Sequence, residues 1–296
     1  MSVKVAFLGP EGTYTHQAVI QQFGIPNVSI YPQQSIGDCF SKIDSKEVDY
    51  AVVPFENSTN GQVVFTYDLL RDWFLSNGTH HPKFKVVAEQ FVAIHHNLLS
   101  NASSIKDIKT IYSHPQVWTQ VNEFLRTVPE SVTKIDVGST SEAARIVSQD
   151  QTNESAAISS FMSSELYKLP ILQKNIETKS NNTTRFLILG YNQPPPSSDD
   201  KKNTKLVSSI MFTLNHDDPG ALCDVLVKFK EYKITLSSIN SRPANLQPWQ
   251  YVFFVEMIGD INNGDLVKDI KGSCLDLVIL GTFERSWKLQ NRKRFL

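Results

Sequence analysis

Strand-like and helix-like segments alternate through the first part of this chain, as far as residue 192, and this pattern limits the possible folds most. Short apolar, β-branched runs predict strands at 3–8, 50–53, 91–94, 111–112, 133–137 and 156–158, and amphipathic segments predict helices at 15–23, 36–45, 117–125, 141–148 and 161–167. Such alternation is typical of α/β domains in which helices cover parallel sheets. Ligands of these sheets bind in loops beyond the carboxyl ends of the strands, so functional residues are expected there.

A proline-rich, charged segment, Gln193–Asn203, ends the alternation and predicts a linker over residues 193–204. The elements predicted beyond it are a strand at 205–214, a helix at 221–232, strands at 234–239 and 251–258, a helix at 266–271 and a strand at 277–281. This βαββαβ order predicts a ferredoxin-like unit. The unit contains no nucleophile–base pair and no cluster of metal ligands, so we interpret it as a binding or regulatory domain.

The composition narrows the classes of function. A net charge of −1 gives no electrostatic case for a nucleic-acid or membrane partner. Three widely spaced cysteines argue against a disulfide framework and a zinc site. The chain enters a strand at once, which argues against a signal peptide, and no apolar run approaches the roughly 20 residues needed to span a bilayer. We therefore expect a soluble, cytoplasmic protein.

The stretch Asn181–Leu189 passes within one step from polar residues to large apolar ones. Its apolar half, Phe186–Leu189, predicts a buried strand, so Arg185 lies at the mouth of that strand. Burying an unpaired charge is costly. Arg185 should therefore meet an anion, which is either an internal Asp or Glu or the carboxylate of a ligand.

Three further loops could carry a site. The turn 9–15 between a strand and a helix would attract an anion, although it also fits a simple glycine turn with Thr15 as the helix N-cap. The polar loop 54–61 follows a predicted strand directly. Residues 113–116 fit a helix cap followed by proline better than a catalytic pair. The pair His95-His96 lacks metal-ligand spacing, which indicates surface or capping histidines.

Four of these motifs, in this order, resemble prephenate dehydratase: Gly9-Pro10-Glu11-Gly12-Thr13, Pro54-x-Glu56-Asn57-Ser58, Ser113-His114-Pro115-Gln116 and Asn182-x-Thr184-Arg185-Phe186. Pro219-Gly220-Ala221-Leu222 and Ser241-Arg242-Pro243 resemble the ACT regulatory domain of that family, which senses phenylalanine. The resemblance covers nearly the whole chain.

The resemblance implies a catalytic domain over residues 1–192, built of two α/β lobes like a periplasmic binding protein, with the active site in the cleft. Lobe 1 would take about 1–88 and 176–192, lobe 2 about 89–175, and the ACT domain 205–296. It also implies a homodimer or homotetramer. The implied reaction converts prephenate to phenylpyruvate, water and carbon dioxide without a cofactor or a metal.

The family also implies roles for single residues. Thr184 would be catalytic, Arg185 would bind a prephenate carboxylate bidentately, and Phe186 would pack beside the ring. Glu56 is a candidate for the ultimate proton donor if burial favours its protonated form. The predicted substrate contacts are Thr13, Asn57, Ser58 and Gln116. The predicted phenylalanine contacts are Asn215, Asp218, Gly220, Ala221, Leu222, Ser241, Arg242 and Pro243.

The sequence departs from the family pattern at three places. Cys223 replaces the usual valine of the Gly-Ala-Leu-Val motif, and Asn240 replaces the glutamate of Glu-Ser-Arg-Pro, which would alter the regulatory site. Residues 72–85 are longer than the usual connection, which predicts a surface insertion. Feedback inhibition by phenylalanine is still expected.

Two other functions fit the same sequence. Arogenate dehydratase performs the same elimination on a substrate with an amino group in place of the keto oxygen. A non-catalytic solute-binding or amino-acid-sensing protein would keep Arg185 and have no use for Thr184; the missing signal peptide argues against an exported binder.

Overall fold

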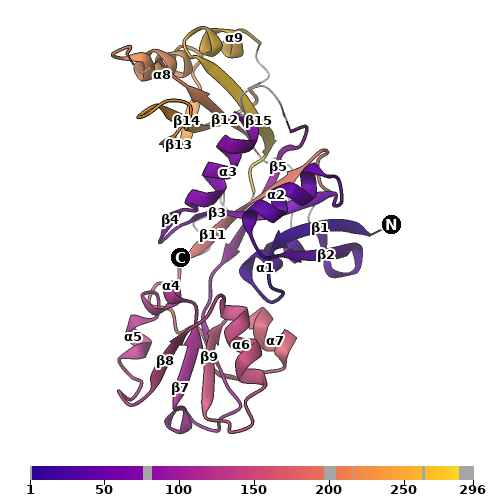
Figure 1. Cartoon of the computed structure of the whole chain (residues 1–296), viewed down its shortest axis with the longest axis vertical. Coiled ribbons are helices and arrows are strands. Elements are labelled where there is room, and N and C mark those ends of the chain that lie inside the picture. Colours follow the sequence, from indigo (N-terminus) through magenta and orange to yellow (C-terminus); the bar gives the residue numbers. More distant parts are fainter. Residues whose placement is uncertain (1, 76–81, 197–204, 216, 262–263, 287–296) are drawn as a thin grey trace.

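The computed structural model describes residues 2–75, 82–196, 205–215, 217–261 and 264–286. Three sheets are stacked along the long axis of the molecule (Figure 1). The first sheet lies in the middle, the second below it in that view, and the ferredoxin-like unit above it. The mixed α/β class predicted from the sequence is confirmed.

The first sheet has the strand order β2-β1-β3-β11-β5, with the short β4 beside β3. Its strands are β1 Val3–Leu8, β2 Val28–Gln33, β3 Tyr50–Asn57, β4 Gly61–Gln62, β5 Lys85–Ala93 and β11 Thr183–Gly190. Its helices are α1 Tyr14–Phe23, α2 Ile36–Asp44 and α3 Val64–Phe74, with a 3-10 turn, η1, at Ile25–Asn27. The segment that predicted an insertion begins inside α3, and residues 76–81 lie outside the described part of the chain.

The second sheet has the order β10-β6-β9-β7-β8. Its strands are β6 Asn97–Leu99, β7 Thr110–Ser113, β8 Thr133–Asp136, β9 Ser155–Ser159 and β10 Ile171–Gln173. Its helices are α4 Pro115–Trp118, α5 Asn122–Leu125, α6 Thr140–Ser148 and α7 Phe161–Tyr167, with a 3-10 turn, η2, at Ile105–Asp107. The single helix predicted at 117–125 is two short helices, with a break that leaves Gln120 between them.

The expectation of parallel sheets holds for only part of each sheet. Strands β1, β2 and β3 pair in parallel, but β11 is antiparallel to both β3 and β5. The chain leaves the first sheet after β5, builds the second sheet, and returns as β11. This return makes no helical crossover, and a helical crossover is what forces neighbouring strands to be parallel. Strand β5 continues to Ala93, beyond the lobe boundary expected near residue 88.

Strand β11 is buried on both faces, which explains its continuous apolar run. Phe186 and Ile188 join the core under α1, and Leu187 and Leu189 join a core on the opposite face. That second core is shared with the ferredoxin-like unit, because it includes side chains such as Met211, Val252, Phe254 and Leu280. The unit therefore packs directly on the first sheet.

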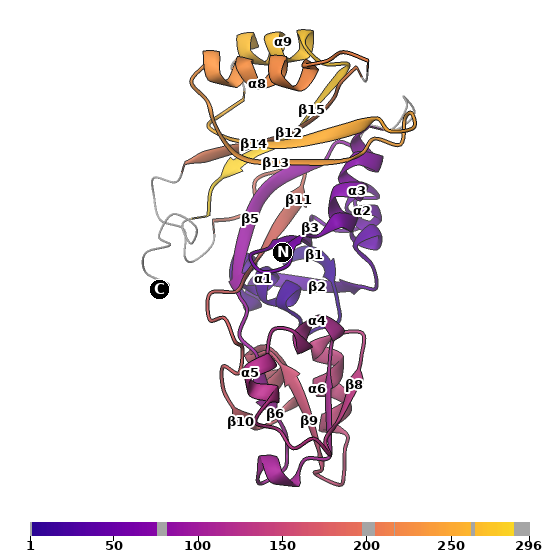
Figure 2. The ribbon, with the colours of Figure 1, turned by 90° about the vertical axis from the view of Figure 1, so that its left-hand side faces the viewer.

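The ferredoxin-like unit has the predicted order βαββαβ. Its elements are β12 Leu206–Thr213, α8 Ala221–Glu231, β13 Thr235–Pro243, β14 Tyr251–Ile258, α9 Gly264–Gly272 and β15 Asp276–Glu284, in a sheet ordered β13-β14-β12-β15. Helices α8 and α9 cover the face turned away from the first sheet (Figure 2). Strand β15 approaches β5 so closely that a Cβ at Gly281 would lie 2.0 Å from the carbonyl oxygen of Val86.

Candidate active site

The first residues of β11 point to opposite faces of the first sheet because side chains alternate along a strand. Thr184 is paired with Asn57 of β3, and Arg185 is paired with Glu56. The ladder shifts register directly after Arg185, so Phe186 faces Pro54. Thr184 and Asn57 therefore share one face, and Arg185 and Glu56 share the other.

Asn57 fixes the orientation of the Thr184 hydroxyl. The Asn57 Oδ1 atom accepts hydrogen bonds from the backbone amides of Thr59 and Asn60, both at 2.9 Å. Its Nδ2 must therefore be the donor toward Thr184 Oγ1, at 2.9 Å. Among the described residues, Thr184 Oγ1 accepts this bond and donates none. Its hydrogen is thus available to an acceptor outside the protein.

A chain of hydrogen-bonded side-chain amides, formed by Asn57, Asn182 and Gln120, crosses from the first sheet to the second. Asn57 Nδ2 also donates to Asn182 Oδ1 at 2.8 Å, and Asn182 Nδ2 donates to Gln120 Oε1 at 2.9 Å. Asn182 is buried, and Gln120 is half-buried in the break between α4 and α5. Figure 2 shows α4 at the junction of the two sheets, where the chain also passes between them. The hydrogen bonds hold Thr184 at this junction.

Arg185 does not face this junction. Its Nε donates to Glu89 at 2.8 Å, and its two terminal nitrogens donate to both oxygens of Glu256 at 2.8 and 2.7 Å. Burial alone would lower the pKa of Arg185, but the two carboxylates outweigh it and raise that pKa. The prediction that Arg185 binds a substrate carboxylate is therefore wrong for this structure. The internal Asp or Glu left open by the sequence is the partner.

Glu56 and Phe186 also lie elsewhere than their predicted roles require. Glu56 is on the Arg185 face of β3, its Oε2 is 4.0 Å from Arg185 Nη1, and its side chain is 44% exposed. Glu56 is therefore neither buried nor beside Thr184 in this structure. Phe186 shares the Thr184 face but is buried in the core with Phe7 and Val52. It supports the strand rather than lining an open site.

The model of one family, described as prephenate dehydratase, matches residues 5–194. The chain belongs to the prephenate dehydratase family. A Saccharomyces cerevisiae protein named probable prephenate dehydratase is 36% identical over 96% of this chain and 97% of its own length. A bifunctional chorismate mutase/prephenate dehydratase from Pseudomonas aeruginosa is 36% identical over 96% of this chain and 74% of its own. The chain is thus a lyase of aromatic amino acid biosynthesis.

Solved structures show the same fold over almost the whole chain. Prephenate dehydratase from Arthrobacter aurescens, in complex with L-Phe, has a TM-score of 0.82 at 24% identity and covers 97% of this chain and 91% of its own. The Staphylococcus aureus prephenate dehydratase has a TM-score of 0.74 at 26% identity, with coverages of 95% and 100%. Both alignments extend through the ferredoxin-like unit, beyond residue 194, where the family match ends.

In the chain described here, the hydroxyl groups of Thr13 and Ser58 make hydrogen bonds within the protein. Thr13, and not Thr15, is the N-cap of α1, and its hydroxyl donates to Pro10 O at 2.9 Å. Gly12, just before it, has φ +83°, and a Cβ there would meet Ser141 Oγ at 2.5 Å. Ser58 Oγ accepts from the Thr183 amide at 2.9 Å and so ties β3 to β11.

The motif 113–116 divides into structural and exposed parts. Ser113 is buried and donates to Ile158 O at 2.9 Å, and His114 caps α4 through Nδ1, as the capping interpretation predicts. Gln116 is exposed. The residue that joins the Thr184 chain is Gln120, which the sequence analysis did not single out. The sequence does show a second glutamine four residues after Gln116, and this was the one signal that could have pointed to Gln120.

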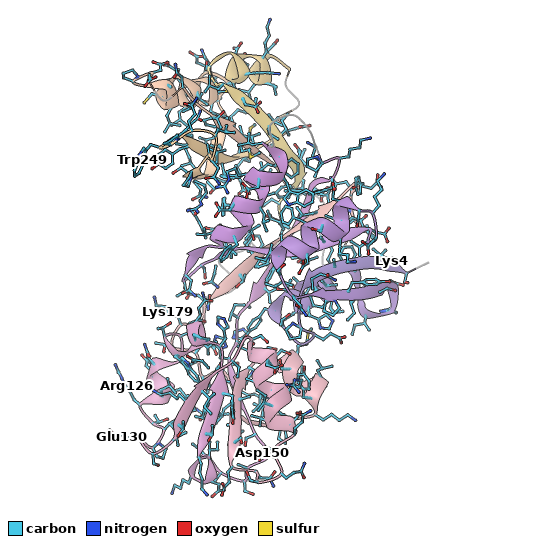
Figure 3. The ribbon with its side chains drawn as sticks, viewed as in Figure 1. Lys4, Arg126, Glu130, Asp150, Lys179 and Trp249 are labelled. Atoms are coloured by element: carbon cyan, nitrogen blue, oxygen red, sulfur yellow. The ribbon has the colours of Figure 1, made fainter. Side chains whose placement is uncertain are left out.

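The predicted phenylalanine contacts lie at one end of the ferredoxin-like sheet. Val252 of β14 pairs with Thr213 on one side and with Arg242 on the other. Thr213 directly precedes the turn that carries Asn215, Asp218 and Gly220, so this turn and Arg242 lie at the same end of the sheet. Arg242 Nε and Nη2 are already bonded to Asp68 of α3, both at 2.9 Å. The remaining members Ala221 and Leu222 begin α8, Ser241 is exposed on β13, and Pro243 borders a hollow of about 350 Å³ that extends to Gln250. Trp249, labelled in Figure 3, also lines this hollow and is 78% exposed.

The described residues form neither a metal site nor a membrane-spanning helix. They contain no group of three or more His, Cys, Asp or Glu side chains placed to hold a metal ion. Their helices include none long and apolar enough to cross a membrane. A hollow of about 420 Å³ near Lys109 and Glu154 lies at the amino ends of β7 and β9, away from the junction that holds Thr184.

Proposed function

We propose that this enzyme converts prephenate to phenylpyruvate, with Thr184 as the catalytic residue. In this elimination the bond to the ring carboxylate breaks and releases carbon dioxide. Its electron pair makes the ring aromatic, and the ring hydroxyl leaves as water after taking up one proton. Thr184 supports this role because Asn57 occupies its acceptor side and leaves its hydrogen free.

A threonine hydroxyl is a weak acid, so Thr184 acts by donating a hydrogen bond to the departing oxygen. The net proton is taken from water. Glu56 is not the source in this proposal, because it lies on the opposite face of β3. Gln116, which is exposed, remains a predicted substrate contact, and Asn57 contributes by orienting Thr184.

Purified enzyme incubated with prephenate, with phenylpyruvate as the readout, tests the activity directly. A parallel incubation with arogenate, read as phenylalanine, separates the two dehydratases. Thr184→Ala is expected to lower kcat far more than it raises KM. A loss carried entirely by KM would reduce Thr184 to a binding contact. If neither substrate is converted, the chain is a binding protein with this fold.

We further propose that residues 205–296 form an ACT domain through which phenylalanine inhibits the enzyme, and that residues 1–192 form the catalytic domain. The two predicted contact motifs lie at the same end of the ferredoxin-like sheet. The Arthrobacter aurescens structure of similar fold is a complex with L-Phe. A homodimer or homotetramer is expected, and the three free cysteines favour the cytoplasm.

The ion cluster around Arg185 supports a coupling between the two domains. Glu256 belongs to β14 of the proposed ACT domain, whereas Arg185 follows Thr184 directly on β11. Asn240, where the family has glutamate, adds a second contact by donating to Tyr67 Oη of α3 at 2.9 Å. Calorimetric titration of the full chain with phenylalanine, followed by inhibition assays, tests the binding and its effect. Binding without inhibition would leave the domain without this regulatory role.

A further inference from the structure

His96 is a buried histidine, 1% exposed, in the segment that carries the chain from β5 into the second sheet. Its Nε2 is 2.8 Å from Gln120 Oε1, and its Nδ1 is 3.2 Å from Tyr14 Oη. The pair His95-His96 was interpreted as surface or capping residues, and His95 is indeed 46% exposed. His96 has a different environment, and it touches the chain of amides that ends at Thr184.

The direction of every hydrogen bond in that chain follows from its fixed end. Backbone amides make Asn57 Nδ2 a donor, so Asn182 Oδ1 accepts and Asn182 Nδ2 donates to Gln120 Oε1. The Gln120 oxygen has no hydrogen, so the group that meets it from the other side must also donate. His96 therefore carries a hydrogen on Nε2.

The Gln120 contact decides the tautomer of this ring. Burial lowers the pKa of His96, so the ring is neutral near pH 7 and has a single N–H. With that hydrogen on Nε2, Nδ1 can only accept. The Tyr14 hydroxyl donates to the carbonyl oxygen of His95 at 2.8 Å and shares the same hydrogen with Nδ1 at 3.2 Å.

We propose that His96 is a positioning residue of the dehydratase: its Nε2–H holds the Gln120 carbonyl oxygen, and through Gln120 and Asn182 it restrains the position of Asn57, which orients Thr184. Without this donor, the Gln120 amide can rotate and present its NH₂ group to Asn182. Asn57 keeps its orientation, because backbone amides fix it, but Asn182 loses its acceptor, and the position of Asn57 beside Thr184 is then less restrained. The inference rests on the proposed role of Thr184 and adds a residue that never touches the substrate.

The backbone of His96 has a separate, structural task. Its amide donates to Glu177 Oε2 at 3.0 Å, and its carbonyl accepts from the Ile176 amide at 2.8 Å, which joins the two segments that cross between the sheets. Side-chain replacements leave these bonds in place. A variant of the ring can therefore separate positioning from the general stability of the crossing.

Two replacements of His96 test the two ring nitrogens separately. In His96→Gln, the amide nitrogen lies as many bonds from the backbone as Nε2 does, so a donor toward Gln120 is kept. In His96→Asn, the amide nitrogen corresponds to Nδ1, and the donor toward Gln120 is lost. The loss of one hydrogen bond of this kind changes a rate or equilibrium constant by up to about tenfold. His96→Asn should therefore lower kcat for prephenate by up to about tenfold with KM little changed, and His96→Gln should recover most of that loss.

Three controls accompany the pair. His95→Asn removes a ring that contacts Glu177 and not the amide chain, so kcat should stay at the wild-type value. Gln120→Met should lower kcat as His96→Asn does, and adding His96→Asn to it should cause no further loss. Thermal unfolding of each variant reports on the structural contribution. Should His96→Asn fail to fold, the contrast between Gln120→Met, with a lowered kcat, and His96→Gln, with a kcat close to the wild-type value, still tests the proposal.

Equal kcat values for His96→Asn and His96→Gln, whether both unchanged or both reduced, would overturn the proposal. Additive losses in the double variant with Gln120→Met would do the same. These outcomes are distinct from a failure of the proposed function, in which the wild-type enzyme itself releases no phenylpyruvate from prephenate.

Discussion

The contact between Arg185 and Glu256 gives the strongest quantitative prediction for this molecule. Both oxygens of Glu256 accept from the guanidinium, and the two side chains are 6% and 5% exposed. Glu256→Gln preserves the shape of the side chain, removes its charge, and turns an NH₂ group toward a nitrogen of Arg185. Because Glu256 lies on β14 and Arg185 on β11, the perturbation falls on the docking of the ferredoxin-like unit.

Removing one partner of a buried ion pair costs about 3–5 kcal/mol, because the other charge stays buried. Glu89 still accepts from Arg185 Nε, and glutamine keeps one acceptor oxygen, so the lower end applies. We expect a loss of about 3 kcal/mol in the free energy of unfolding, which is roughly a hundredfold change in an equilibrium constant. Against a typical total of about 5–15 kcal/mol, this is a large fraction.

Urea unfolding of the wild type and Glu256→Gln measures the loss, and prephenate turnover with and without phenylalanine measures its functional effect. The matched control is Glu231→Gln, which removes the partner of Lys228 in an exposed pair of the same unit and should cost less than about 0.5 kcal/mol. If Glu256→Gln costs no more than this control, the buried ion cluster does not hold the unit in place, and the reasoning fails.

Three further predictions use other parts of the structure. Gly281→Ala should destabilise the enzyme by about 1–3 kcal/mol in urea unfolding, because its Cβ would meet Val86 O at 2.0 Å; Gly138→Ala, with open space around it, should not. Thr184→Ser keeps a hydroxyl and should retain kcat within about tenfold, whereas Thr184→Ala should lose about a hundredfold or more in phenylpyruvate release. Burial lowers the pKa of His16 and His96, so the unfolded state takes up protons first as the pH falls below 6.5. Stability is then lost by at most about 1.4 kcal/mol per pH unit for each ring, and His16→Gln should reduce the slope of the urea midpoint against pH.

Periodicity in the sequence was sufficient for the ferredoxin-like unit and for most helices of the two lobes. It failed where local signals were weak or long-range pairing decided the outcome. Strand β2 has no buried residue and contains Pro32, so its pattern resembles a loop, and β6 and β10 have only three residues each. The antiparallel entry of β11 depends on the path through the second sheet, and no local pattern carries that path.

The candidate site was predictable to the same extent. The pairing of Thr184 with Asn57 follows from two motifs that lie at strand ends, and the structure brings them to 2.9 Å. The partner of Arg185 was not predictable in identity, because Glu256 is 71 residues away on a strand with no motif of its own. The physical rule still held, since a buried guanidinium requires a carboxylate. What the rule cannot decide is whether that carboxylate belongs to the protein or to the substrate.

The alternation of β11 explains how one strand serves both domains. Thr184 faces the junction of the two sheets, and Arg185, one peptide unit later, is held by a carboxylate of the ferredoxin-like sheet. The register shift directly after Arg185 interrupts the ladder at this point, so the start of β11 is less constrained than its buried remainder. A movement of β14 that displaces Glu256 therefore acts on the Arg185 backbone and on the adjoining Thr184. In the proposed regulation, the effect of phenylalanine binding would pass from β14 through Glu256 and Arg185 to Thr184.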